Sequence, residues 1–159
     1  LVIAEKKSVA EDITKAFAAS SAGTTFANKK TSFESDDFVI SWAVGHLAEL
    51  ADPEYYDEKL KKWRMADLPI VPGTFAVVPR AEGKSAKDQL EAIRKLLARD
   101  DVERIVNACD AGREGELIFA YVRDVASKRD LPVERAWFSS MTKTAIREAF
   151  SRAFAETIR

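Results

Sequence analysis

Residues 104–121 read Arg-Ile-Val-Asn-Ala-Cys-Asp-Ala-Gly-Arg-Glu-Gly-Glu-Leu-Ile-Phe-Ala-Tyr, and this stretch decides the fold. Its apolar run, Ile105 to Cys109, has a charged residue before and after it, which is the pattern of a buried strand in a parallel sheet. From Arg113 onward, apolar residues recur at a helical spacing that buries one face, namely Leu117, Ile118, Tyr121, Val122 and Val125. The stretch therefore predicts a strand, a tight acidic turn and a helix.

The turn carries an unusual mixture of groups. Gly112 and Gly115 flank Arg113, and three carboxylates crowd the same few residues: Asp110, Glu114 and Glu116. Ligands of open α/β sheets bind beyond the carboxyl ends of the strands. Hard carboxylate oxygens suit magnesium, which keeps several of its sites for water and phosphate. The turn is therefore a candidate magnesium site.

A purely structural interpretation explains part of the same pattern. Glu114 and Glu116 would be favourable charges in the first turn of a helix, and Asp110 would be its N-cap. The two glycines and the guanidinium favour the metal site, because few structural requirements explain that combination.

The rest of the chain alternates strands and helices. We expect strands over 1–4, within 31–42, and over 75–78 and 133–138, with an irregular segment over 51–72. We expect helices after Ser8, whose hydroxyl would form a capping box with Glu11, from Ser85, and over 142–154. This order predicts an α/β fold with a mostly parallel central sheet flanked by helices.

The first strand delivers a second acidic group to the sheet. Glu5 follows the strand directly, and Lys6 and Lys7 come next. If this strand is a parallel neighbour of the central one, Glu5 and Asp110 converge at one edge.

Bulk properties narrow the class of protein. The 159 residues suit a single domain over 1–159, and the net charge of −1 argues against a freestanding DNA-binding module, which is usually basic. The one cysteine, Cys109, cannot form an internal disulfide, which indicates a reducing, cytoplasmic setting. No apolar run is long enough for a membrane span. A start without methionine and an end within a helical pattern favour an excised piece of a longer polypeptide.

The acidic segment Asp-Ala-Gly-Arg-Glu-Gly-Glu-Leu-Ile from Asp110 resembles the acidic motif of the TOPRIM domain of type IA DNA topoisomerases, especially the topoisomerase III branch. Four further stretches are similar to that family, in its order: residues 1–10, Val-Gly-His-Leu from Val44, Trp-Arg-Met-Ala-Asp-Leu-Pro-Ile from Trp63, and Phe-Ser-Ser-Met-Thr from Phe138 with the Ala-Ile-Arg-Glu-Ala-Phe that follows it. The resemblance covers nearly the whole chain and implies a Rossmann-like TOPRIM fold.

The resemblance also implies a function. In that family a tyrosine cuts one DNA strand and becomes linked to the 5′ phosphate, a second strand passes through, and the break is resealed. The acidic positions of the family correspond to Glu5, Asp110 and Glu114, which would hold Mg²⁺ beside the scissile phosphate. Lys6 corresponds to a lysine that lies against this phosphate. The partners implied are a single-stranded DNA segment and the remaining domains of a parent topoisomerase, of which this chain would be the N-terminal fragment.

Three of the assigned residues, Lys6, Arg113 and His46, can be explained either as DNA contacts or by an ordinary structural role. Lys6 would otherwise be a solvated lysine, Arg113 is placed either to pair with a phosphate or to form a salt bridge with Glu116, and His46 is either a DNA contact or a structural hydrogen-bonding group. One position departs from the family: many type IA enzymes read Asp-x-Asp-x-Glu in the acidic turn, and this chain has Gly112 in place of the middle acid. The departure predicts weaker metal binding and leaves the number of metal ions open.

The nucleophile of the family is missing from this chain. Tyr55, Tyr56 and Tyr121 are its only tyrosines, and none stands in the family's catalytic context. The tryptophans are expected at the core or its edge, since nothing in the sequence makes them base-stacking platforms: Trp42, Trp63 and Trp137. Two alternatives stay open, a TOPRIM primase or nuclease that uses no tyrosine, and a non-enzymatic α/β signalling module such as a receiver.

Overall fold

The computed structural model describes residues 1–20, 23–80 and 83–156. The central sheet has six strands in the order β2-β3-β4-β1-β7-β8. These strands are β1 (Val2–Ala4), β2 (Ala27–Asn28), β3 (Ser32–Glu34), β4 (Val39–Trp42), β7 (Ile105–Ala108) and β8 (Val133–Arg135). A second sheet pairs β5 (Ala48–Leu50) with β6 (Val77–Pro79).

The core of the sheet is parallel, as the sequence predicts. β1 lies between β4 and β7 and is parallel to both, and β8 runs parallel to β7. β2, β3 and β4 are joined antiparallel at one side. The expected α/β class with a mostly parallel central sheet is therefore confirmed.

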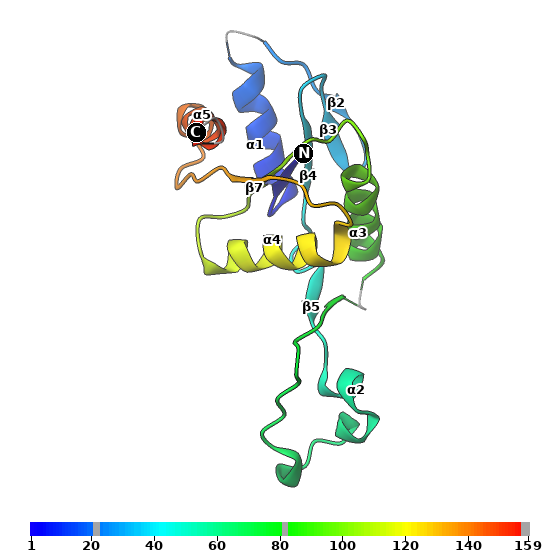
Figure 1. Ribbon diagram of the computed structural model, residues 1–159. Coiled ribbons are helices and arrows are strands. Elements are labelled where there is room, and N and C mark those ends of the chain that lie inside the picture. Colours follow the sequence, from blue (N-terminus) through cyan, green and yellow to red (C-terminus); the bar gives the residue numbers. More distant parts are fainter. Residues whose placement is uncertain (21–22, 81–82, 157–159) are drawn as a thin grey trace.

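Helices cover both faces of this sheet (Figure 1). α1 (Lys7–Ala18) and α5 (Lys143–Glu156) pack on one face, over Val2, Ala4 and Val106. α3 (Lys84–Leu97) and α4 (Arg113–Ala126) pack on the other, over Ile3 and Ile105. Successive residues of β1 face opposite layers, and all three are fully buried, so this strand forms the centre of the molecule.

Two local expectations about helices are wrong. Ser8 does not cap α1, because the chain already turns after Glu5 and Lys6 is the N-cap, without a side-chain cap bond. Glu11 pairs instead with Lys7, at 3.8 Å. On α4 the buried face is Gly115, Ile118, Phe119, Val122 and Ala126, whereas Leu117 is 42% exposed.

The irregular segment expected over 51–72 forms three short helical turns: α2 (Pro53–Tyr56) and the 3-10 helices η1 (Glu58–Lys61) and η2 (Met65–Asp67). Together with β5 and β6 it extends away from the sheet and its helices (Figure 1). No helix in the described part of the chain has the length and apolar character needed to cross a membrane.

Candidate functional site

The carboxyl ends of β1 and β7 bring the predicted acidic groups to one edge of the sheet. The two strands pair in register, with Ala4 opposite Ala108, so Glu5 and Asp110 both follow the end of a strand there. Glu5 is 8% exposed, whereas the side chain of Asp110 is 53% exposed. The predicted convergence of the two acids is therefore confirmed, with one carboxylate sheltered and the other open to solvent.

Lys6 lies between these two carboxylates. Its Nζ is 3.1 Å from Glu5 Oε1 and 3.6 Å from Asp110 Oδ2. The hydrogen bond to Glu5, together with the charges of Glu5 and Asp110, raises the pKa of Lys6 above its usual value, so the amine stays protonated at neutral pH. The pairing offsets repulsion between the carboxylates, and it brings both acids within reach of one shared cation.

The third predicted acid faces a different partner. Glu114 lies in the first turn of α4, and its Oε1 is 3.4 Å from Nε2 of His46. His46 follows Gly45, whose φ of +70° lies in the left-handed region that glycine adopts without strain. The structure thus brings His46, the only histidine, to the acidic edge from a loop 68 residues away in the sequence.

Within the described residues, no three His, Cys, Asp or Glu side chains are clustered tightly enough to hold a metal ion. Glu5 and Asp110 share Lys6, while Glu114 is turned toward His46. The magnesium site assigned to Glu5, Asp110 and Glu114 therefore stays a prediction. The donor set still fits the ion, because all three groups supply hard oxygen atoms and the two exposed ones leave room for water ligands.

The structure excludes two structural roles that were expected as alternatives at the acidic turn. Gly112 is the N-cap of α4 and no side chain caps the helix, so Asp110 is not the N-cap. No ion pair joins Arg113 to Glu116 in the described chain, and the side chain of Arg113 is exposed at the edge. Gly112 has φ 176° and ψ 173°, an extended conformation open to any residue.

Gly115 has a different role, because the helix start passes very close to the turn. A Cβ atom added there would lie 2.2 Å from the carbonyl oxygen of Asp110 and 2.9 Å from its amide nitrogen. Only a residue without a side chain permits this approach. Gly115 therefore allows α4 to pack directly against the backbone that carries Asp110.

An arginine that sequence reasoning missed holds this turn together. Arg135, at the end of β8, donates from Nε to Glu116 Oε1 at 2.6 Å and from Nη2 to the carbonyl oxygen of Asp110 at 3.1 Å. Its Nη1 donates to the carbonyl oxygens of Asn107 and Ala136, at 3.1 and 2.8 Å. The guanidinium also stacks over Trp137, 4.7 Å from the ring centroid. Arg135 thus ties β7, the acidic turn and α4 together.

Asn107 completes the support beneath the turn. Its amide donates to the second carboxylate oxygen of Glu116 at 3.1 Å, and its side-chain oxygen accepts from the amide of Cys109 at 3.0 Å. Glu116 is therefore a structural anchor, unlike Glu114. The sequence signal for this network is slight: it consists of one arginine within the strand expected over 133–138, and only the β7–β8 register places this arginine opposite Asn107.

Cys109, directly after β7, is a buried free thiol. Burial, with a smaller contribution from the Glu5 charge, raises the pKa of its thiol to about 12. The thiol stays neutral at pH 7 and lies 3.7 Å from the carbonyl oxygen of Ile3. A protonated, buried thiol is neither a ligand nor a nucleophile.

The sequence predicts all three tryptophans at the core or its edge, and this holds for only one of them. Trp42 is buried, at 4% exposure, whereas Trp137 is 52% and Trp63 76% exposed. Trp137 covers Arg135 instead of entering the core, and Trp63 lies between η1 and η2. The placement of Trp63 and Trp137 at the core was therefore wrong.

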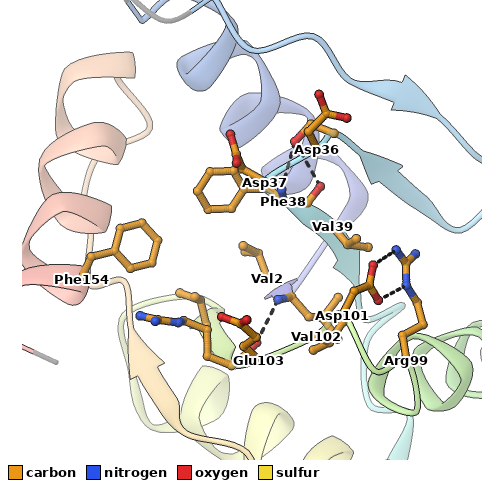
Figure 2. Close-up of a pocket in the computed structure, with 14 residues that line it drawn as sticks. Val2, Asp36, Asp37, Phe38, Val39, Arg99, Asp101, Val102, Glu103 and Phe154 are labelled. Carbon is orange, nitrogen blue, oxygen red and sulfur yellow. Dashed lines mark hydrogen bonds and ion pairs between the residues drawn. The ribbon is translucent and has the colours of Figure 1, made fainter.

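A separate cavity of about 280 Å³ lies at the opposite edge of the sheet (Figure 2). It is lined by the first residues of β1 and β4, Val2 and Val39, and by the loop that precedes β7. One of the two arginines that line it, Arg99, is held in an ion pair with Asp101 at 2.6 Å. Parallel sheets bind ligands at the other edge, so this cavity is distinct from the candidate site.

Comparison with known proteins agrees with this geometry. The family model described as the Toprim domain matches residues 1–141. Proteins named DNA topoisomerase 3 from Bacillus subtilis strain 168 and Staphylococcus aureus strain USA300 are 40% and 39% identical to this chain, over 96% and 94% of its residues. The chain spans about one fifth of the length of these relatives, 20% in each case. The chain belongs to the Toprim domain family, in the form found in these topoisomerase 3 proteins.

Proposed function

We propose that this chain is the Toprim portion, and the N-terminal part, of a cytoplasmic type IA DNA topoisomerase that cleaves, passes and reseals DNA strands. The observation that supports the proposal best is the meeting of Glu5, Lys6 and Asp110 at the carboxyl edge of the parallel sheet. A relative that is 40% identical over 96% of this chain is named DNA topoisomerase 3, which favours this activity over that of a Toprim primase or nuclease. The Toprim match disfavours a receiver module.

The proposed substrate is a single-stranded DNA segment lying across this edge. Asp110 and Glu114 would hold Mg²⁺, with Glu5 as a sheltered third carboxylate, and the bound ion would orient a phosphate oxygen and neutralise charge. Arg113 is exposed beside them and can pair with a neighbouring phosphate, and His46 would contact DNA next to Glu114.

Lys6 is the candidate group for the leaving oxygen. When a tyrosine oxygen attacks the phosphorus atom, the bond to the 3′ oxygen breaks and that oxygen takes up a proton. Lys6 is protonated, exposed and fixed between two carboxylates, so its ammonium can donate that proton or stabilise the phosphate charge. The tyrosine would come from a domain outside this chain.

DNA cleavage tests this function directly. The full-length polypeptide that carries this chain, mixed with a 3′-labelled single-stranded oligonucleotide and denatured, is expected to give a covalent protein–DNA band. The label stays with the adduct because the tyrosine takes the 5′ phosphate. The 159-residue chain alone should give no such band. An adduct that maps to Tyr55, Tyr56 or Tyr121 would contradict the proposed division of roles.

Metal binding by Asp110 has a separate test. In the 159-residue chain, magnesium at ten times its dissociation constant should add about 1.4 kcal/mol of stability, or roughly 3–5 °C in Tm. Asp110→Asn is expected to remove most of this increase, because it replaces the exposed carboxylate at the strand end. Asp124→Asn, on an exposed face further along α4, is the matched control and should keep the increase. Equal increases in the two variants would move the ion elsewhere.

Restoring an acid at residue 112 should strengthen the site. Gly112 is extended, and a Cβ added there meets no atom within 4 Å, so Gly112→Asp carries no steric cost. Magnesium affinity is expected to rise roughly tenfold, the scale of one modest added interaction. Gly112→Asn is the control, since it has the same shape and also caps the helix but lacks the charge. Titration calorimetry giving equal affinities for both variants would mean that residue 112 points away from the ion.

A further inference from the structure

Residues 49–80, which we call the arm, have no core of their own. The arm contains the last two residues of β5 together with α2, η1, η2 and β6, and none of the residues 49–80 is buried. Figure 1 shows it extending from the sheet well beyond the helices that cover the two faces. Ordering a segment of this length costs conformational entropy that burial normally offsets, and the arm lacks that burial.

Large apolar side chains are concentrated in this arm. Of the twelve large apolar residues exposed in the described chain, seven lie there: Leu50, Tyr55, Trp63, Met65, Leu68, Val71 and Phe75. Met65, Trp63 and Val71 are the extreme cases, at 85%, 76% and 73% exposure. Exposed apolar side chains gathered in one segment indicate a contact site, whereas single scattered ones do not.

The arm has a defined shape despite this exposure. Arg64 binds both carboxylate oxygens of Asp67, at 2.8 and 3.1 Å, and so closes the turn at η2. The amide of Ala76 donates to the Tyr56 hydroxyl at 2.7 Å, and the amide of Ala51 donates to the carbonyl oxygen of Ala76 at 2.9 Å. A preordered segment loses less entropy when it docks, which is the property of a binding element.

The chemistry of the arm fits a protein partner and not DNA. Residues 49–80 contain six acidic and five basic side chains, whereas a nucleic-acid surface is strongly basic. Arg64, next to Trp63, is already neutralised by Asp67. Exposed Trp, Tyr, Phe and Met together are typical of the central part of a protein–protein interface.

We infer that the arm docks into the remaining polypeptide of the parent topoisomerase, an inference that rests on the function proposed above. The relatives are about five times as long as this chain, which leaves ample polypeptide to cover the arm. The base of the arm also adjoins the candidate site, because β5 and β6 pack on α4 and His46, just before β5, contacts Glu114. A domain that grips the arm is thereby held beside the edge where the missing tyrosine has to arrive.

Amide hydrogen exchange tests the inference by comparing the arm in the full-length polypeptide with the arm in the 159-residue chain. Amides of residues 60–76 are expected to exchange at least about tenfold more slowly in the full-length polypeptide than in the 159-residue chain. Trp63→Ser combined with Met65→Ser should abolish this difference and lower the Tm of the full-length protein. The same pair of substitutions in the 159-residue chain is the control, and should leave its Tm within about 1 °C because neither side chain is buried there.

Each other outcome overturns the inference. Equal exchange in the two proteins would mean that nothing covers the arm. Protection of the 159-residue chain that rises with its own concentration would identify a second copy as the partner, and protection only on adding a single-stranded oligonucleotide would identify DNA. The covalent DNA band separates the two proposals: cleavage with an unprotected arm refutes the docking alone, and a protected arm without cleavage refutes the function alone.

Discussion

Gly115→Ala is expected to lower the free energy of unfolding of the 159-residue chain by about 2–3 kcal/mol, the cost of forcing an added atom into a closely packed place. The new Cβ would lie 2.2 Å from the Asp110 carbonyl oxygen and 2.9 Å from its amide nitrogen. Both of these atoms belong to the backbone, so a side-chain rotation cannot relieve the contact. Either α4 or the turn has to move, and urea unfolding monitored by circular dichroism measures the cost.

The same substitution should also weaken magnesium binding. Moving the Asp110 backbone breaks its contact with Arg135 and shifts the carboxylate that follows β7. Gly112→Ala is the matched control, because it adds the same methyl group three residues earlier, where no atom lies within 4 Å and the backbone is extended. It should cost less than about 1 kcal/mol, mainly as a poorer N-cap. Equal losses in the two variants would refute the close-packing argument.

Arg135→Gln is expected to cost about 2 kcal/mol of stability and to reduce the magnesium-induced rise in Tm by at least half. The substitution leaves Glu116 with only the Asn107 amide and releases the Asp110 carbonyl oxygen. The expected loss of stability is limited because the side chain of Glu116 is 48% exposed, so water compensates part of the lost charge pairing. Arg135 acts through the turn as a positioning residue, which is why the magnesium response is the decisive measurement.

Two further variants separate positioning from general loss of an arginine. Arg135→Lys keeps the charge but cannot reach the same set of acceptors, so it should recover the Glu116 pairing and little of the magnesium response. Arg64→Gln removes an arginine that also binds a carboxylate through two hydrogen bonds, but in an exposed turn of the arm. It should leave both the urea midpoint and the magnesium response nearly unchanged. An Arg135→Gln protein that behaves like Arg64→Gln would contradict the positioning role of Arg135.

The sequence by itself determined the alternation of strands and helices and the two strand ends that carry acids. Ile105 to Ala108 forms the buried strand, α4 begins at Arg113, and Glu5 and Asp110 each follow shortly after the end of a strand. These features depend on periodicity, on the order of strands and helices, and on the resemblance of several motifs to one family, and all of them can be recognised from neighbouring residues. The α/β class follows from the same signals.

Only the tertiary structure decided which partners meet across the sheet. The Arg135–Asp110 contact joins residues 25 apart in sequence, and the His46–Glu114 contact joins residues 68 apart. Local patterns carry no information about such pairs, because they depend on strand register and on how close two backbones come. The two glycines of the acidic motif look alike in sequence, yet only Gly115 lies against the Asp110 backbone. The exposure of apolar side chains was also decided by the tertiary structure. Leu117 and Trp63 are apolar but face solvent, because burial depends on whether another element covers the side chain.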